Sequence, residues 1–176
     1  MTPSHPLVEH IAVLRKRPGT RQAFRAEVSF DDLAITTARL PADEPVVVDL
    51  TLESIAEGVV ASGTITYAWE GECRRCLASV RGEESAPVRE IFATHPIEGE
   101  TWPLGPDSIN LEPIVRETVL LTLPLAPLCD QACAGPVPEQ FPAKVEGQDG
   151  DGASDGSDRP AKDPRWSALD QLEFDQ

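Results

Sequence analysis

The sequence predicts an α+β fold in which an antiparallel β-meander carries one main helix. Four segments alternate between apolar and polar residues, which is the pattern of half-buried strands. One later segment has the start and stop signals of a helix. Of the 176 residues, 40% are hydrophobic and only nine are aromatic (three Trp, one Tyr and five Phe). The chain can therefore form one domain around a mainly aliphatic core.

The predicted strands are residues 21–30, 46–54, 59–69 and about 78–92. In the second strand, Val46, Val48 and Leu50 fall on one face and polar residues on the other. Glu57-Gly58 offers a turn between the second and third strands. Gly63 predicts a bulge in the third strand. Strands joined this closely favour an antiparallel meander.

The helix is predicted to run from Asn110 to Leu123. Asn110 is a good N-terminal cap, and Pro113 is tolerated in the first turn, where its missing N–H would have no partner. Pro124 ends the helix. Its large apolar surface predicts burial against the sheet and a second surface.

Composition divides the chain into three parts. Residues 1–142 are predicted to form the α+β domain, including a basic N-terminal arm. Residues 143–163 are rich in Gly, Asp, Ser and Pro, which predicts a disordered acidic linker. Residues 164–176 have the spacing of a short amphipathic C-terminal helix. In it, Trp166 and Leu169 are candidates for contact with a partner or with the domain itself.

Charge is distributed unevenly along the chain. The formal net charge is −15, but residues 1–25 hold five basic residues against one acidic residue. An acidic body repels phosphate and anionic lipid and attracts basic proteins. The basic residues proposed to contact nucleic acid are Arg15, Lys16, Arg17 and Arg21. The alternative interpretation is a solvated terminus that happens to be basic.

No segment predicts a membrane span or a targeting signal. The most apolar stretch, residues 119–128, is about half the length that a bilayer requires and contains two prolines. We therefore expect a cytoplasmic protein with no membrane contact. In that reducing compartment, metal binding or free thiols are more common than structural disulfides.

The cysteines form two closely spaced pairs. The first is Cys-x2-Cys between two predicted strands, and the second is Cys-x3-Cys after the helix. The candidate metal ligands are Cys73, Cys76, Cys129 and Cys133. Four thiolates in two such pairs suit a tetrahedral zinc, which would join the sheet to the loop after the helix. The alternatives are unligated thiols, or a redox pair whose thiolate is favoured by Arg74 and Arg75.

Nothing in the sequence nominates a catalyst. Phosphate-binding, dinucleotide-binding and nucleophile-elbow motifs are absent. His5, His10 and His95 lie near the N-terminus or a proline, without a carboxylate or cysteine at ligand spacing. We therefore expect a protein that is not an enzyme.

Residues 71–77, Gly-Glu-Cys-Arg-Arg-Cys-Leu, resemble the Gly-x-Cys-x-Arg-Cys-Leu signature of the YceD family, the large-ribosomal-RNA-subunit-accumulation proteins. The resemblance extends to residues 50–59 before the signature, and to residues 110–113 and 123–129 around the helix. Residues 163–169 resemble the terminal motif of actinobacterial-type members.

One departure from the family pattern lies after Cys133. Members usually continue into a second Cys-Pro-x-Cys pair, whereas this chain has Val137 and Gln140 at the two cysteine positions. If the family's four downstream cysteines bind a metal among themselves, this chain has lost that site. If Cys73 and Cys76 are the partners of the pair that remains, four ligands are still present.

The resemblance implies a factor that supports formation of the large ribosomal subunit. Its partner would be a basic large-subunit ribosomal protein or a pre-ribosomal particle, with rRNA contact through the N-terminal arm. The alternative is a zinc- or thiol-dependent regulatory module unrelated to ribosomes.

Overall fold

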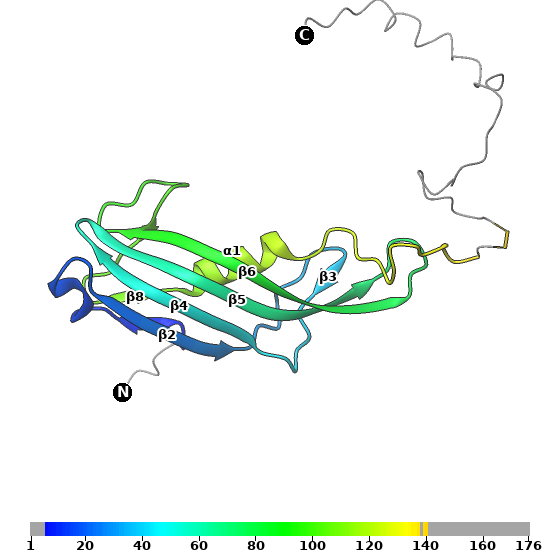
Figure 1. The fold of residues 1–176 in the computed structure, drawn as a ribbon, viewed down its shortest axis with the longest axis horizontal. Coiled ribbons are helices and arrows are strands. Elements are labelled where there is room, and N and C mark those ends of the chain that lie inside the picture. Colours follow the sequence, from blue (N-terminus) through cyan, green and yellow to red (C-terminus); the bar gives the residue numbers. More distant parts are fainter. Residues whose placement is uncertain (1–5, 138, 141–176) are drawn as a thin grey trace, which may run out of the picture. The chain divides into compact units, whose positions relative to one another are not determined.

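The structure, a computed structural model, describes residues 6–137 and 139–140 (Figure 1). The predicted linker at 143–163 and the predicted C-terminal helix at 164–176 lie outside the described residues. Within the described part of the chain, no helix is long and apolar enough to cross a membrane.

The described residues form eight strands, one short 3₁₀ helix and one α-helix. The strands are β1 (Val8–His10), β2 (Arg21–Val28), β3 (Ala38–Arg39), β4 (Val46–Ile55), β5 (Gly58–Glu72), β6 (Ser79–Ala93), β7 (Trp102–Pro103) and β8 (Ser108–Asn110). The 3₁₀ helix is Leu14–Lys16, and α1 is Glu112–Thr122. The predicted α+β class is confirmed.

The main sheet has the order β2-β4-β5-β6-β7, with β3 paired to β5. The four predicted strands are β2, β4, β5 and β6, and their pairings are antiparallel. The meander prediction is wrong only at the edge, where β7 pairs with β6 in parallel. A separate two-stranded sheet joins β1 and β8. Each of these two strands has only three residues, which is too short to show the alternation of apolar and polar residues that predicts a strand.

The predicted bulge at Gly63 is wrong. Gly63 pairs with Leu50 on one side and Val88 on the other, and the register continues without a break. A side chain there would place its Cβ 2.2 Å from the carbonyl oxygen of Asp49. Glycine is therefore needed for the close approach of two backbones rather than for an extra residue.

Helix α1 packs against β5 and β6 through its buried residues Ile114, Val115 and Val119. The side-chain oxygen of Asn110 accepts a hydrogen bond of 3.0 Å from the Glu112 N–H, so the predicted cap is present although Leu111 occupies the cap position itself. At the other end, the hydroxyl of the buried Tyr67 lies 2.7 Å from that of Thr122. The chain that follows α1 runs toward the turn between β5 and β6.

Candidate metal centre

The first cysteine pair lies in the tight turn between β5 and β6. The Cys73 N–H donates to the Ala78 carbonyl at 2.8 Å, and the Leu77 N–H donates to the Cys73 carbonyl at 2.8 Å. Leu77 has a φ of 60°, a left-handed conformation that closes the turn. This backbone path turns Cys73 and Cys76 toward the same point.

The second pair lies in the loop after α1. The Cys133 N–H donates to the Asp130 carbonyl at 3.1 Å, and the Asp130 carboxylate accepts from the Ala132 N–H at 2.7 Å. These local bonds fold the Cys-x3-Cys segment into a compact turn. The Asp130 carboxylate contributes because a short acidic side chain can accept a hydrogen bond in place of a backbone carbonyl.

Arg75 joins the two turns. Its guanidinium donates to the carbonyl oxygens of Gln131 and Cys133, both at 3.0 Å. A backbone bond of 2.9 Å, from the Arg74 N–H to the Pro127 carbonyl, adds a second connection. Hydrogen bonds therefore join the two cysteine turns in addition to the approach of their sulfur atoms.

The four sulfur atoms lie within 4.8 Å of one another. The Sγ atoms of Cys73 and Cys133 are 3.8 Å apart, and those of Cys76 and Cys129 are 3.6 Å apart. A disulfide would need about 2.05 Å. Sulfurs bound at about 2.3 Å to a tetrahedral zinc are about 3.8 Å apart. The donor set and its spacing therefore fit a four-thiolate metal ion.

Burial and electrostatics differ among the four thiols. Cys73 and Cys133 are buried, Cys76 is partly buried and Cys129 is exposed. Hydrogen bonds from the backbone of Cys76 and Cys129 lower the pKa of Cys73 to about 6. Hydrogen bonds with the Cys133, Cys76 and Cys73 thiols raise the pKa of Cys129 to about 12. A cation among the sulfurs would favour the deprotonated form of the thiols.

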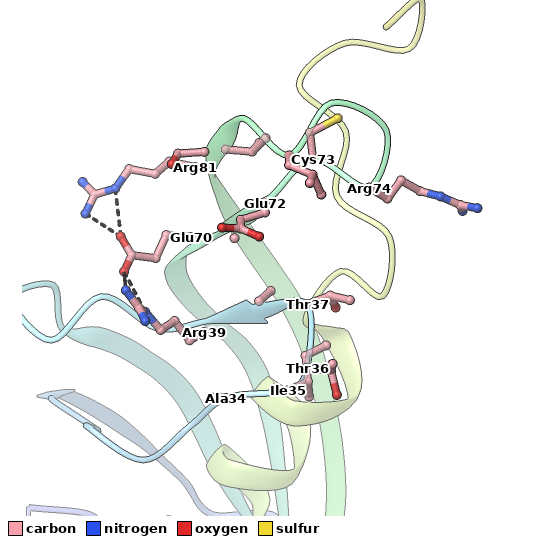
Figure 2. A pocket seen from close by; sticks show the side chains of 15 residues that line it. Ala34, Ile35, Thr36, Thr37, Arg39, Glu70, Glu72, Cys73, Arg74 and Arg81 are labelled. Carbon is pink, nitrogen blue, oxygen red and sulfur yellow. Dashed lines mark hydrogen bonds and ion pairs between the residues drawn. The ribbon is translucent and has the colours of Figure 1, made fainter. Parts of the chain in front are cut away.

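The alternative of a redox pair activated by arginine has little geometric support. The guanidinium of Arg75 binds backbone carbonyls. The Arg74 side chain points away from the other labelled residues (Figure 2). The low pKa of Cys73 comes first from backbone hydrogen bonds of Cys76 and Cys129, with a smaller contribution from the Arg75 backbone. The turn also lies between two strands, whereas low-pKa cysteines often lie at the start of a helix.

The residues proposed to contact nucleic acid belong to folded elements. Arg15, in the 3₁₀ helix with Lys16, donates to the Pro106 carbonyl at 2.7 Å. Arg17 follows this helix, and Arg21 in β2 forms an ion pair with Glu53 at 3.0 Å. All four basic side chains are exposed. Their RNA contact stays a prediction, and Trp166 and Leu169 lie outside the described residues.

Comparison with known proteins identifies the family of the chain. The family model described as "Large ribosomal RNA subunit accumulation protein YceD" matches residues 61–173, a span that contains both cysteine pairs and α1. This chain belongs to the YceD family. Its membership ties it to accumulation of large-subunit ribosomal RNA.

Mycobacterial relatives match over most of the chain. Uncharacterised proteins of Mycobacterium bovis and Mycobacterium tuberculosis are each 30% identical over 181 residues, covering 95% of this chain and 81% of the relative. An uncharacterised protein of Mycobacterium leprae is 30% identical over 139 residues, covering 74% of this chain and 64% of the relative. No solved structure matches.

Sequence reasoning named the four cysteines of this YceD-family chain but missed the residues around them. The Arg75 contacts have backbone acceptors, which leave no trace in a sequence. Glu70 and Arg81 were also missed, although they lie opposite each other on β5 and β6 and form an ion pair at 3.0 Å. Counting outward from the Cys-x2-Cys turn would have placed them face to face.

Proposed function

We propose that this YceD-family protein is a non-enzymatic cytoplasmic factor that binds a basic ribosomal protein or a pre-ribosomal particle during assembly of the large subunit. The family match over residues 61–173 carries this proposal. The protein would act by holding its partner rather than by chemistry.

Charge supports a basic partner. A net charge of −15 on 176 residues attracts ribosomal proteins rich in lysine and arginine and disfavours general adhesion to RNA. The exposed basic side chains between Arg15 and Arg21 would then contact rRNA phosphates at close range, after the partner has brought the RNA near.

We further propose that the four cysteines hold one zinc ion. Zinc favours four thiolates in tetrahedral geometry, and the sulfur distances of 3.6 and 3.8 Å suit that arrangement. With four protein ligands, the ion would have no open position for water or substrate, as in structural rather than catalytic sites. A tetrathiolate site can also hold iron. Elemental analysis of the purified protein and its visible absorption distinguish the two metals.

The function is tested by affinity purification of the tagged protein from its native host at low and high salt. Large-subunit precursors or a basic ribosomal protein should co-purify at low salt and be lost at high salt. The loss is expected because the screening length falls from about 10 Å at 0.1 M to about 3 Å at 1 M. Recovery of the protein alone at low salt would contradict the proposal, and salt-insensitive recovery would contradict its electrostatic basis.

A second candidate is a zinc- or thiol-dependent regulatory module unrelated to ribosomes. The exposure of Cys129 within the cluster favours it, because an exposed metal ligand is open to oxidation and exchange. This candidate predicts metal-loaded protein that never co-purifies with ribosomal material but changes its partners when the thiols are oxidised.

A further inference from the structure

A cleft of about 850 Å³ lies beside the cysteine cluster (Figure 2). Residues 34–39 line one side of it, and residues 70–74, at the end of β5 and the start of the cysteine turn, line another. Leu77 and residues 79–81 complete the lining. Cys73 belongs both to the cleft and to the four-thiol cluster. A metal ion bound by the cluster would therefore fix one residue of the cleft lining.

The two arginines at the rim of the cleft are paired with two glutamates, Glu70 and Glu44. Arg39 donates to Glu70 at 2.8 Å, and Arg81 donates to the other oxygen of Glu70 at 3.0 Å. These hydrogen bonds, Arg39 first and then Arg81, hold the pKa of the Glu70 carboxyl below its usual range. Arg81 also approaches Glu44 at 3.5 Å. The arginines are thus occupied and offer little attraction to an incoming anion.

Glu72 also lines the cleft, and within the described residues its carboxylate is not paired as that of Glu70 is. It follows Glu70 on the same face of β5 and is exposed, and its side chain has no hydrogen bond or ion pair to any described residue. Figure 2 shows its side chain between the Cys73 turn and Thr37, whereas Arg74 points away. The Glu72 carboxylate is therefore a local negative charge inside a cleft whose lining holds three arginines and two glutamates.

Leu77 adds an apolar surface beside this charge. It is 68% exposed, although it is a large hydrophobic residue. It also has a left-handed φ of 60°, which glycine would adopt at lower cost. A strained, exposed side chain at the edge of a cleft is typical of a contact surface. Val80 and Ile35 line the same cleft.

We propose that this cleft binds an extended segment of a basic protein, with a lysine or arginine at Glu72 and an apolar side chain against Leu77. The inference rests on the proposed function in that the partner is a basic protein, and it assigns the place where that partner is held. The metal would stabilise the cleft through Cys73.

The test uses the full-length, metal-loaded protein and a short labelled peptide in which lysine alternates with valine. Fluorescence anisotropy should show binding of this peptide and none of the version with glutamate in place of lysine. Glu72→Gln should weaken binding about fivefold, the value of one partly exposed ion pair. Glu57→Gln, which makes the same charge change at the opposite end of β5, should leave binding unchanged.

Leu77→Ser is the second variant and should also weaken peptide binding. Metal content is measured for each variant, so that a damaged cysteine turn is recognised and that variant is replaced by Val80→Ser. Equal weakening by Glu72→Gln and Glu57→Gln would overturn the proposal, because general charge attraction would then explain the binding. Tighter binding of single-stranded RNA than of the lysine peptide, weakened by Leu77→Ser, would overturn it in favour of a nucleic-acid site.

Failure of this inference is distinguishable from failure of the proposed function. If Glu72→Gln and Leu77→Ser bind the peptide as the wild type does while ribosomal precursors still co-purify, the cleft assignment is wrong and the function stands. If the wild type never co-purifies with ribosomal material, the function is wrong, and the peptide measurements still decide the chemistry of the cleft.

Discussion

The sheet core and the cysteine end of this protein are held together by different forces. The sheet core is the buried face of β4, β5 and β6, where residues such as Leu50, Ile65 and Phe92 are at most 1% exposed. The cysteine end comprises residues 73–78 and 127–133, where the buried side chains include two thiols and Leu77 is exposed.

The difference concerns what each region needs in order to stay folded. Each fully buried aliphatic side chain contributes about 1.5–3 kcal/mol, so the sheet core is stable through apolar burial. The cysteine end buries little apolar surface and relies on hydrogen bonds such as those of Arg75. We infer that the cysteine end would depend on a bound metal ion and that the sheet core would not.

Metal removal gives the largest expected effect. Structural zinc sites supply about 10–16 kcal/mol at neutral pH. After chelation, amide hydrogen exchange should become fast in residues 74–78 and 129–133, while the paired amides of β4 and β5 stay protected. Loss of protection in both regions together would show that they unfold as one cooperative unit. It would contradict the inference that only the cysteine end depends on the metal.

Cys133→Ser extends this test to a single atom. The buried thiol would be replaced by a hydroxyl that is a poor zinc ligand, so the purified variant should contain little metal. Ser85→Cys, which places a thiol on the exposed face of β6 outside the cysteine turn, controls for a general change in thiol content. Unchanged metal content in Cys133→Ser would exclude this cysteine as a ligand.

Phe92→Ala tests the stability of the sheet core. Phe92 is 1% exposed and lies opposite Val59, so its truncation should lower the free energy of unfolding by about 3–5 kcal/mol. Ile91→Ala, at the neighbouring residue that is 40% exposed, should cost less than about 1 kcal/mol. Chemical denaturation measures both values. Metal content should be unchanged in the folded state of either variant.

Leu77→Gly should produce a smaller effect of the opposite sign. A left-handed conformation costs a non-glycine residue about 1–2 kcal/mol, and glycine loses about 0.5–1 kcal/mol of this advantage through backbone entropy. Because the Leu77 side chain is exposed, little packing is lost. The midpoint of metal-loaded unfolding should rise slightly while peptide binding falls. A lower midpoint would mean that Leu77 stabilises the turn.

The smallest effect is expected from the ion pairs at the rim. Hydrogen bonds from Arg39 and Arg81 depress the pKa of Glu70, so their contribution is present above the unfolded value of about 4.3 and is lost as the pH falls through the lower folded value. A carbon NMR titration should therefore place the Glu70 midpoint below the ordinary glutamate value of about 4.3. Arg39→Ala should raise the Glu70 midpoint. A Glu70 midpoint at or above that ordinary value would contradict the ion pairing.

The same contrast explains what the sequence could predict. Strands β2, β4, β5 and β6 were predicted because long alternating segments carry a clear period. The four cysteines were predicted as one site because their spacing is characteristic. The role of Gly63 was misassigned, since a close backbone approach and a bulge both favour glycine. The cleft was missed because residues 34–39, which line it, reach it through a short bridge to β5 rather than through a recognisable strand.

The two cysteine turns are close in space but far apart along the chain. Cys76 and Cys129 are separated by 53 positions, and the segment between them contains all of β6 and α1. An ion held by both pairs closes this loop, and a covalent crosslink over such a length would restrict the unfolded chain by about 4 kcal/mol. An unfolded chain offers only isolated pairs of thiols. High-affinity metal binding would therefore follow the folding of β6 and α1, which brings the two pairs together, and the bound ion would then hold that loop closed.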